Sequence, residues 1–354
     1  MLIQLLFACG ANITNTPNTD LYEKQEEIDS EVAEETEETN TSEDSNSNNG
    51  SGTNEDIPNE DNGSTNTDPE ESEGSQSETT DPNPSNLTDY SIPGNYTYTS
   101  MNSIATATNC MEGLSYTVYT PDTTDETPVV ILGHGFLRGG EKMFGWAEHL
   151  ASWGIKTVVP TLCHYNVLNG VDHEMNGQNM VELAGVIGAT SPIYAGQSAG
   201  GLAAVIAASM DPTALGVVGL DATDTAGIPG VPDNIGLNYV MNLTTPAFAL
   251  VGEPSTCNSN NNGVTMYQGI TTSQIVRVTD SDHCDYESPT DWGCESFCLN
   301  ETTTLPKEAI LPVIQQLATS AILWIAGTET DAQDHWSSEN LSSLENSGSI
   351  TVIK

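Results

Sequence analysis

The stretch that decides the fold is SPIYAGQSAGGLAAVIAASM, residues 191–210. A short apolar run at residues 193–195 leads directly into Gly-Gln-Ser-Ala-Gly, which a run of small and apolar residues follows. A serine on a tight turn between a strand and a helix needs small neighbours, because a larger side chain would clash with the turn. The pattern therefore predicts a strand, a sharp turn that presents the hydroxyl of Ser198, and a helix at residues 202–210.

The chain from about residue 92 alternates between apolar runs and helical patterns. Further strands are predicted at residues 129–132, 157–159, 216–220, 247–251 and 275–278, the last of these being the final strand. Further helices are predicted at residues 146–153, 175–187 and 309–325. Continuous apolar runs are typical of parallel strands buried on both faces. The order predicts an α/β domain with a mostly parallel central sheet and helices on both faces.

Composition divides the chain into a signal segment (1–9), an acidic linker (10–91), the α/β domain (92–340) and a C-terminal tail (341–354). The 354 residues include 50 acidic and 7 basic side chains, for a formal net charge of −43. This excess argues against nucleic acid and anionic membrane surfaces as partners, since both require basic patches. The linker, rich in acidic and small polar residues, is predicted to be disordered and self-repelling.

The N-terminal segment MLIQLLFACGAN resembles a bacterial lipobox at Leu6-Phe7-Ala8-Cys9. The resemblance implies that Cys9 becomes the lipidated first residue after signal cleavage. We expect a protein exported to the outer membrane or cell surface, or secreted, that meets a membrane only through this anchor. The acidic linker would hold the domain away from the surface. No further stretch is expected to span a bilayer.

Six cysteines follow the lipobox, and an even number in an exported chain predicts up to three disulfides with the pairing left open. They are Cys110, Cys163, Cys257, Cys284, Cys294 and Cys298. Cys294 and Cys298 are close enough to pair locally, whereas Cys257 and Cys284 each follow a predicted strand and could join two loops. The spacing matches no standard zinc finger, so no metal is expected.

In an open parallel sheet, reactive side chains lie at the carboxyl ends of the strands. Ser198 needs a base, and in hydrolase chain order the histidine follows both the serine and the acid. Only His283 and His335 come late enough. We expect His283, because it follows the strand at 275–278, whereas His335 lies in a polar segment after the final helix.

The acid has three candidates. Asp221 directly follows the strand at residues 216–220 and would be held rigidly there. Asp224 lies further along the same loop, and Glu253 follows the strand at residues 247–251. An acid at either strand end can orient an imidazole. Asp221 is preferred, with Asp224 and Glu253 as alternatives.

The strand at 129–132 leads into Gly133-His134-Gly135-Phe136. Glycines there let the backbone approach a substrate, and we expect the backbone N–H groups of Phe136 and Ala199 to form an oxyanion hole. His134 is expected to order this loop through hydrogen bonds.

Two groups of polar residues contain side chains that can bind metals, but we expect other roles for both. The first follows the strand at 157–159 and is predicted to form a wall of the substrate pocket: Cys163, His164, Asp172, His173 and Glu174. The second surrounds His283 and is expected to be solvated, with calcium binding as the alternative: Asp280, Asp282, Asp285 and Glu287.

These motifs resemble the α/β-hydrolase group that contains chlorophyllases, platelet-activating-factor acetylhydrolases and cutinase-like polyester hydrolases. The resemblance rests on HGF after a strand, the G-x-S-x-G-G turn, the aspartate in LDA, the late DH and the segment HLASWGIKTVVP, and it covers residues 95–335. In the first two groups the acid position implies Asp221. In the polyester hydrolases the acid follows the next strand, where this chain has Glu253. Cys257 and Cys284 lie where the latter enzymes can carry a disulfide between acid and histidine loops.

The sequence thus predicts a monomeric serine hydrolase of carboxylic esters, without a cofactor. Its acidic surface would favour a small neutral ester or a polyester over anionic substrates. The alternatives are a polyester hydrolase or lipase, and a non-catalytic, surface-tethered binding protein on a hydrolase scaffold. The triad does not specify the leaving group.

Overall fold

The structure is a computed structural model that describes residues 87–354, except residues 107, 124–125, 127, 166–169, 229 and 299–302. The expected signal segment with Cys9 and all but the end of the acidic linker lie outside the described residues.

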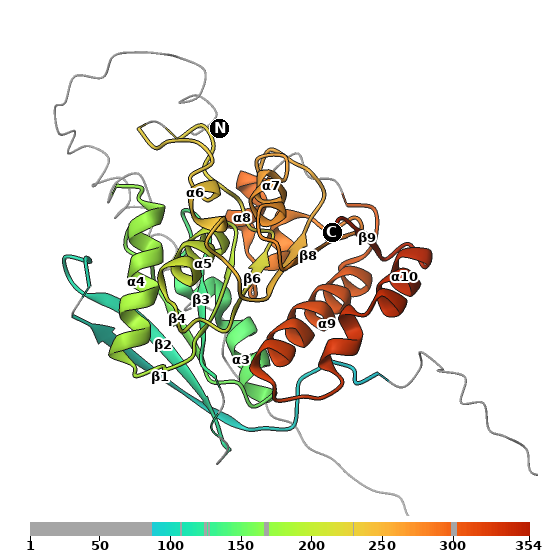
Figure 1. Cartoon of the computed structure of the whole chain (residues 1–354), viewed down its shortest axis with the longest axis horizontal. Coiled ribbons are helices and arrows are strands. Elements are labelled where there is room, and N and C mark those ends of the chain that lie inside the picture. The colour runs from blue at the N-terminus through green and yellow to red at the C-terminus, as the bar shows by residue number, and fades with distance from the viewer. Residues whose placement is uncertain are drawn as a thin grey trace, which may run out of the picture. The chain divides into compact units, whose positions relative to one another are not determined.

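The described residues form a nine-stranded sheet in the order β1-β2-β4-β3-β5-β6-β7-β8-β9 (Figure 1). The strands are β1 (Tyr98–Ala105), β2 (Leu114–Pro121), β3 (Val130–Gly133), β4 (Thr157–Pro160), β5 (Ile193–Gln197), β6 (Gly216–Leu220), β7 (Ala247–Val251), β8 (Ser273–Val278) and β9 (Ile350–Val352). Neighbours from β4 to β8 pair in parallel, whereas β1, β2 and β9 pair antiparallel at the two edges. The predicted α/β class with a mostly parallel sheet is confirmed.

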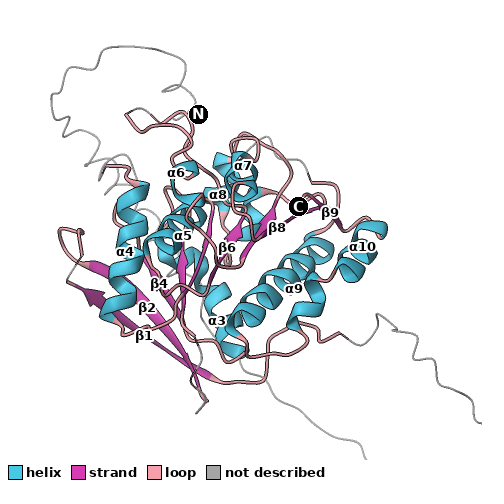
Figure 2. Cartoon of the chain, viewed as in Figure 1, coloured by secondary structure: helices cyan, strands magenta, loops and turns pink. Residues whose placement is uncertain are grey.

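Helices flank the sheet (Figure 2). They are α3 (Phe144–Ser152), α4 (His173–Val186), α5 (Ala199–Met210), α6 (Leu237–Val240), α7 (Asn262–Gln268), α8 (Trp292–Phe297), α9 (Lys307–Ala326) and α10 (Ser338–Asn346), with 3-10 turns η2 (Gly140–Met143), η3 (His283–Tyr286) and η4 (Ala332–Trp336). Two hydrophobic clusters separate the layers, one containing residues of α3 and α9 and the other residues of α4 and α5. Alternate residues of β3 enter opposite clusters, since Val130 and Leu132 pack in the first and Ile131 in the second. Both faces of the sheet are therefore buried, as predicted.

The carboxy-terminal segment extends the sheet, so the expectation that residues 275–278 form the final strand is wrong. β9 pairs antiparallel with β8, with Val352 opposite Val276. α10 precedes β9 and buries Leu341 in the core. The segment has one short apolar run at its end, and such a run becomes an edge strand only when a sheet lies beside it.

Helix α9 qualifies as a membrane span by length and composition, contrary to the sequence-based expectation. It has 20 residues, and its most apolar 18-residue window has a mean hydropathy of 1.7. Half of its most apolar window is nevertheless buried inside the domain, where Ile314, Leu317 and Ala318 pack in the core. A core helix of a large α/β domain is apolar for this reason, and α9 is such a helix.

Candidate active site

The turn at Ser198 joins β5 to α5 in a conformation that side chains rarely adopt. Its backbone has φ 54° and ψ −123°, a strained combination for a residue other than glycine. The surrounding structure fixes it: the Ser198 N–H donates to the carbonyl of Leu220 (3.1 Å), and the Thr223 N–H donates to the carbonyl of Ser198 (3.1 Å). The turn at Ser198 is therefore anchored to the end of β6.

The predicted need for small neighbours around Ser198 is confirmed. A β-carbon built on Gly196 would lie 2.3 Å from the carbonyl carbon of Gly200, and one on Gly200 would lie 2.4 Å from the carbonyl carbon of Gly133. A β-carbon on Gly201 would meet that of Ala222 at 2.5 Å. Real β-carbons do not approach other atoms so closely, so a side chain at these positions would force α5 away from β5, from β3 or from the loop after β6.

His283 and Asp221 form a buried pair at the same edge of the sheet. Nδ1 of His283 lies 2.6 Å from Oδ2 of Asp221. Both residues are buried, at 6% and 1% exposure. An ionised carboxylate only accepts hydrogen bonds, so the imidazole proton lies on Nδ1. A neutral imidazole then has a lone pair on Nε2, the nitrogen that a base uses.

Asp221 is held by more than the histidine. Its backbone also has a positive φ of 45°, and its N–H donates to the carbonyl of Leu250 at 2.7 Å. Its carboxylate accepts from the N–H of Gly252 (3.0 Å) and from the side-chain amide of Asn258 (3.1 Å). Asn258 is fully buried and was not anticipated from the sequence, in which nothing distinguishes it from the other asparagines of its loop.

The structure places the alternative acids elsewhere. Asp224 accepts hydrogen bonds from the N–H groups of Thr225 and Gly236. Glu253 accepts from the N–H of Asp280 and lies 3.8 Å from Arg277. Among the three candidates, the carboxylate that contacts His283 within the described part of the chain is that of Asp221.

The second histidine candidate, His335, is also buried and lies in a different environment. It contacts the side-chain amide of Gln316 at 2.9 Å and the ring of Tyr90 at a centroid distance of 5.0 Å. These contacts join η4 to α9 and to the start of the described chain, and the hydrogen bonds of His335 are structural.

The loop after β3 lies against the turn at Ser198. A β-carbon built on Gly135 would lie 3.3 Å from that of Ser198, so the loop passes beside the serine. Phe136 follows directly in this loop. Ala199 is the first residue of α5, where backbone N–H groups have no acceptor within the helix. The two residues expected to supply oxyanion donors therefore flank Ser198.

His134 orders this loop, as expected. Its Nδ1 lies 2.9 Å from the carbonyl of Gly135, and its Nε2 accepts from the N–H of Leu162 at 2.9 Å. Because the side chain is fully buried, desolvation lowers the pKa of His134 to about 4. The residue is neutral near pH 7 and links the loops that follow β3 and β4.

An ion-pair network joins the loop after β3 to the loop that carries His283. Arg138 donates two hydrogen bonds to Glu287, at 2.7 and 2.9 Å, and a third to Asp291. Lys142 also pairs with Asp291. Burial alone would raise the pKa of Asp291, but hydrogen bonds from Lys142 and Arg138 hold it well below its usual value. The network fixes the candidate oxyanion loop relative to His283.

The acidic residues near His283 are mostly paired with protein cations or backbone donors. Lys307 pairs with Asp282 at 2.6 Å and also with Asp285, while Asp280 accepts from the backbone of Thr304. The expectation that these carboxylates are solvated is wrong for Asp285 and Glu287, which are each 5% exposed. Their negative charge is offset by Lys307 and Arg138, because α9 and the loop after β3 carry these cations into the cluster.

Three disulfides are present among the described residues, in agreement with the predicted number. They are Cys110–Cys163, Cys257–Cys298 and Cys284–Cys294. Of the pairings that the sequence left open, neither Cys294–Cys298 nor Cys257–Cys284 forms. Instead, Cys294 of α8 bonds to Cys284, and Cys298 at the end of α8 bonds to Cys257. The two cysteines of α8 are one helical turn apart, and each bonds to a different loop. Disulfides fit an oxidising environment outside the cytosol.

Among the described residues, one cluster of three cysteines has its sulfur atoms close enough together to hold a metal ion. The sulfur atoms of Cys284, Cys294 and Cys298 lie within 4.8 Å of one another. All three are committed to disulfides, which leaves no thiolate to bind an ion.

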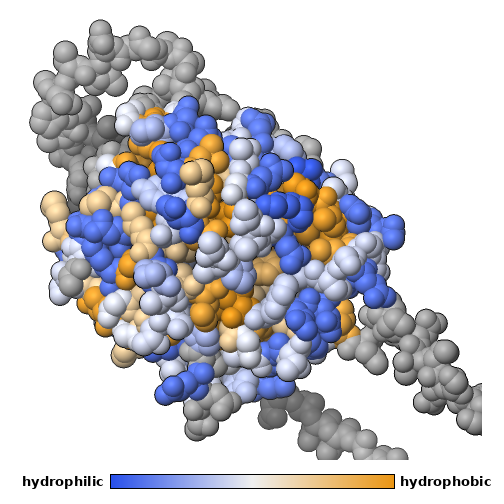
Figure 3. Space-filling view, viewed as in Figure 1, coloured by the Kyte–Doolittle hydropathy of each residue, from blue (hydrophilic) through white to orange (hydrophobic). Residues whose placement is uncertain are grey.

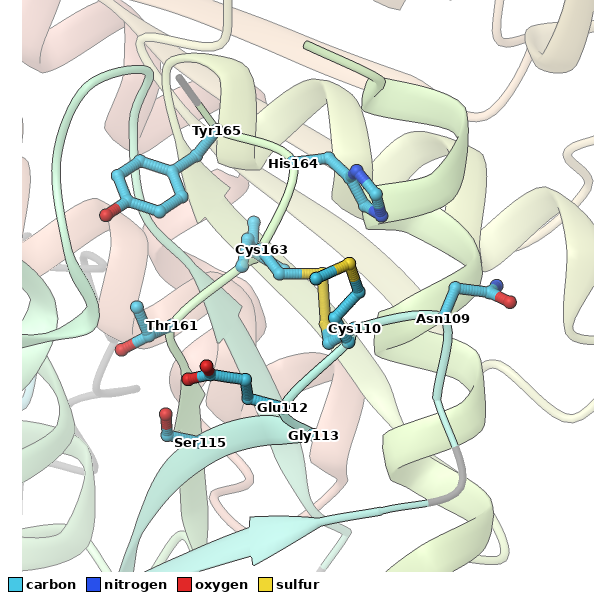
Figure 4. A pocket seen from close by; sticks show the side chains of 11 residues that line it. Asn109, Cys110, Glu112, Gly113, Ser115, Thr161, Cys163, His164 and Tyr165 are labelled. Atoms are coloured by element: carbon cyan, nitrogen blue, oxygen red, sulfur yellow. A yellow bond between two sulfur atoms is a disulfide. The ribbon is translucent and has the colours of Figure 1, made fainter. Parts of the chain in front are cut away.

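The loop after β4 lines a pocket of about 580 Å³ together with residues 109–115 (Figure 4). The Cys110–Cys163 disulfide lies at its centre, with His164 and Tyr165 above it in that view. The Tyr165 ring packs edge-on against His134, with centroids 5.2 Å apart, and its carbonyl accepts from the N–H of Leu137 at 3.0 Å. The pocket wall is therefore continuous with the loop that passes Ser198.

Further along the same loop, His173 packs edge-on against Phe136, with ring centroids 6.4 Å apart. It is buried, and desolvation lowers its pKa to about 4. Glu174 contacts the hydroxyl of Tyr239, which joins the start of α4 to α6. The start of α4 therefore contacts the candidate oxyanion loop through His173.

The arrangement brings a strained serine, an imidazole and the buried carboxylate that contacts it to the carboxyl ends of the parallel strands, with the loop that leads to Phe136 beside the serine. Such a set can activate a hydroxyl and stabilise an oxyanion. No protein-family model matches the chain, and no curated protein matches its sequence significantly.

Proposed function

We propose that this protein is a serine hydrolase of the α/β-hydrolase fold that cleaves carboxylic esters. The observation that carries the proposal is the 2.6 Å contact between His283 and Asp221, at the sheet edge where Ser198 occupies its strained turn. The chain order of serine, acid and histidine supports the fold, as does an oxyanion loop that follows the third strand.

In the proposed reaction, Ser198 attacks the ester carbonyl while Nε2 of His283 accepts the hydroxyl proton. Asp221 holds the imidazole and stabilises its charged form. The N–H groups of Ala199 and Phe136 donate to the oxyanion of the tetrahedral intermediate. His283 then returns the proton to the leaving alcohol, and an acyl-enzyme remains. Water activated by His283 hydrolyses the acyl-enzyme and restores Ser198.

The substrate we propose is a neutral ester. The chain carries a formal net charge of −43, which would lower the local concentration of anionic substrates. Figure 3 shows hydrophobic and hydrophilic residues intermixed on the face viewed in Figure 1. We further propose that the enzyme is exported and tethered through Cys9, which the disulfides support but the described residues do not include.

The experiment that tests this function assays the full-length chain on p-nitrophenyl esters with acyl chains of two to sixteen carbons. We expect turnover by the wild type, labelling by a fluorophosphonate probe, and loss of both in Ser198→Ala. Ser209→Ala is the matched control, because this serine lies on the same helix and its hydroxyl donates only to the carbonyl of Ile206. A folded wild type that neither hydrolyses any ester nor takes up the probe would favour the non-catalytic binding protein instead.

A further inference from the structure

The side chain of Gln197 lies against the candidate base. Gln197 ends β5 directly before Ser198 and is 1% exposed. Its amide nitrogen lies 3.2 Å from Nε2 of His283 and 3.4 Å from the main-chain oxygen of the same residue. Nε2 of His283 is also the atom that receives the Ser198 proton in the proposed reaction. No local sequence pattern predicts this contact, because the two residues lie 86 positions apart.

The main-chain carbonyl of His283 determines which end of the amide faces the ring. A carbonyl oxygen only accepts hydrogen bonds, so the NH₂ end of Gln197 points toward it. The same NH₂ group therefore meets Nε2, and it can donate there only when Nε2 carries no proton. An unprotonated Nε2 is consistent with the contact on the opposite side of the ring, where Nδ1 carries the proton and donates it to Asp221.

The carbonyl end of the Gln197 amide is compatible with this orientation. Oε1 of Gln197 is buried and has no hydrogen-bond partner in the part of the chain that the structure describes. It lies against Gly135, since a β-carbon built on that glycine would be 2.4 Å from it. No competing acceptor or donor therefore turns the amide around, and Gly135 provides the space that the side chain needs.

Resting on the function proposed above, we propose that Gln197 is a positioning residue that holds His283 neutral, with its proton on Nδ1 and its lone pair on Nε2. A donor at Nε2 stabilises the neutral ring and opposes the imidazolium, so it keeps the base available at lower pH. Nε2 has one lone pair, and the amide releases it when the Ser198 hydroxyl donates. The hydrogen bond that Nε2 then loses from the amide is replaced by the one from the Ser198 hydroxyl.

Other charged groups also face His283, and they stay the same when a neutral residue replaces Gln197. Asp221 contacts Nδ1 from the end of β6. Glu287, which pairs with Arg138, also interacts electrostatically with His283. On η3 itself, Asp282 and Asp285 pair with Lys307 of α9. A change in the His283 titration in Gln197→Met is therefore attributable to the lost amide.

The test titrates His283 by long-range ¹H–¹⁵N NMR in the full-length chain, with its signal assigned from His283→Gln. We expect the wild type to show the Nδ1–H tautomer when neutral. Gln197→Met should raise the pKa of His283 by about 0.5 to 1, the size of one hydrogen bond. Gln197→Glu should raise it further, because a carboxylate accepts from the protonated ring. Gln178→Met is the matched control, since Gln178 is exposed and pairs with Glu182 on α4.

The same variants give a second measurement, since the acid limb of the pH profile of kcat/KM should move upward by the same amounts. An unchanged His283 titration in Gln197→Met, or an Nε2–H tautomer in the wild type, would overturn the inference. The tautomer needs no variant, so it decides even if Gln197→Met does not fold. An inert wild type with the expected titration overturns ester hydrolysis alone, whereas an active one with an unchanged titration overturns only the role of Gln197.

Discussion

Nδ1 of His283 lies 2.6 Å from Oδ2 of Asp221, and this contact joins the end of β8 to the end of β6 across 62 residues of chain. It fixes the plane and tautomer of the imidazole. The contact lies beside Ser198 at the carboxyl ends of the strands, since β5, which ends directly before Ser198, pairs with β6.

The first prediction concerns the acid. Asp221→Asn keeps the size of the side chain but cannot hold the proton of His283 on Nδ1, so kcat/KM on a p-nitrophenyl ester should fall by about 10³- to 10⁴-fold. Glu253→Gln and Asp224→Asn are the controls, and each should stay within about threefold of the wild type, because neither carboxylate contacts His283. A larger loss in Glu253→Gln than in Asp221→Asn would contradict the assignment.

The second prediction concerns the buried ion pair between Arg138 and Glu287, whose side chains are 10% and 1% exposed. Arg138→Met leaves the Glu287 charge buried without its partner, and the free energy of unfolding should fall by about 3 to 5 kcal/mol. The double variant Arg138→Met with Glu287→Met should recover much of this loss. Chemical denaturation measures both.

The control for that pair is Arg277→Met. Arg277 lies 3.8 Å from an exposed Glu253, so its loss should cost less than about 1 kcal/mol. Equal losses in Arg138→Met and Arg277→Met would mean that burial does not strengthen the Arg138 pair.

The third prediction concerns helix α8, which two disulfides connect to both loops that support the candidate triad. Cys284 neighbours His283, and Cys257 neighbours Asn258, the donor to Asp221. Replacing both Cys284 and Cys294 by alanine should cost about 3 kcal/mol of stability from loop entropy. The same replacement should lower kcat/KM about tenfold or more, measured well below the melting temperature of the variant. The reason is that the loop that carries His283 is no longer held in place by the disulfide.

The matched control replaces Cys110 and Cys163 together. This disulfide closes a longer loop, so the stability cost should be about 4 kcal/mol, but it contacts neither His283 nor Asp221. Its kcat on p-nitrophenyl acetate should change less than about threefold, because loss of this disulfide alters the pocket that it lines and leaves the position of His283 unchanged. If activity falls equally in both double variants, α8 has no special role at the site.

The fourth prediction concerns acid stability. Burial lowers the pKa of His134 and of His173 to about 4, below the ordinary value near 6.5. Between pH 6.5 and 4 the unfolded chain therefore binds protons that the folded chain excludes, and stability falls as the pH is lowered through this window. Each histidine contributes about 3 kcal/mol at most.

Chemical denaturation at a series of pH values between 7 and 4 measures this loss. His173→Leu should flatten the dependence, because Nδ1 of His173 has no hydrogen-bond partner among the described residues and its removal breaks no bond at that atom. A pH dependence that is the same in the wild type and in His173→Leu would show that His173 does not titrate as its burial implies.

Much of the fold could be predicted from local patterns. The buried strands β5, β6 and β7 are continuous apolar runs, and α5 and α9 have long apolar patterns, so their positions agree with the structure to within a few residues. β1 was not predicted, because most of its residues are exposed on an edge strand and carry no apolar period. Residues 350–352 form a strand only because β8 offers its free edge.

The sequence by itself determined the glycine-rich turn around Ser198, because steric exclusion of β-carbons acts between near neighbours. It also narrowed the acid and the base to a few positions at strand ends. The tertiary structure alone decided that Asp221 meets His283, that Gln197 and Asn258 support them, and that α8 separates the expected cysteine pairs. These contacts join residues that are far apart in the chain. Which residues meet depends on the order of the strands in the sheet, and no local sequence pattern determines that order.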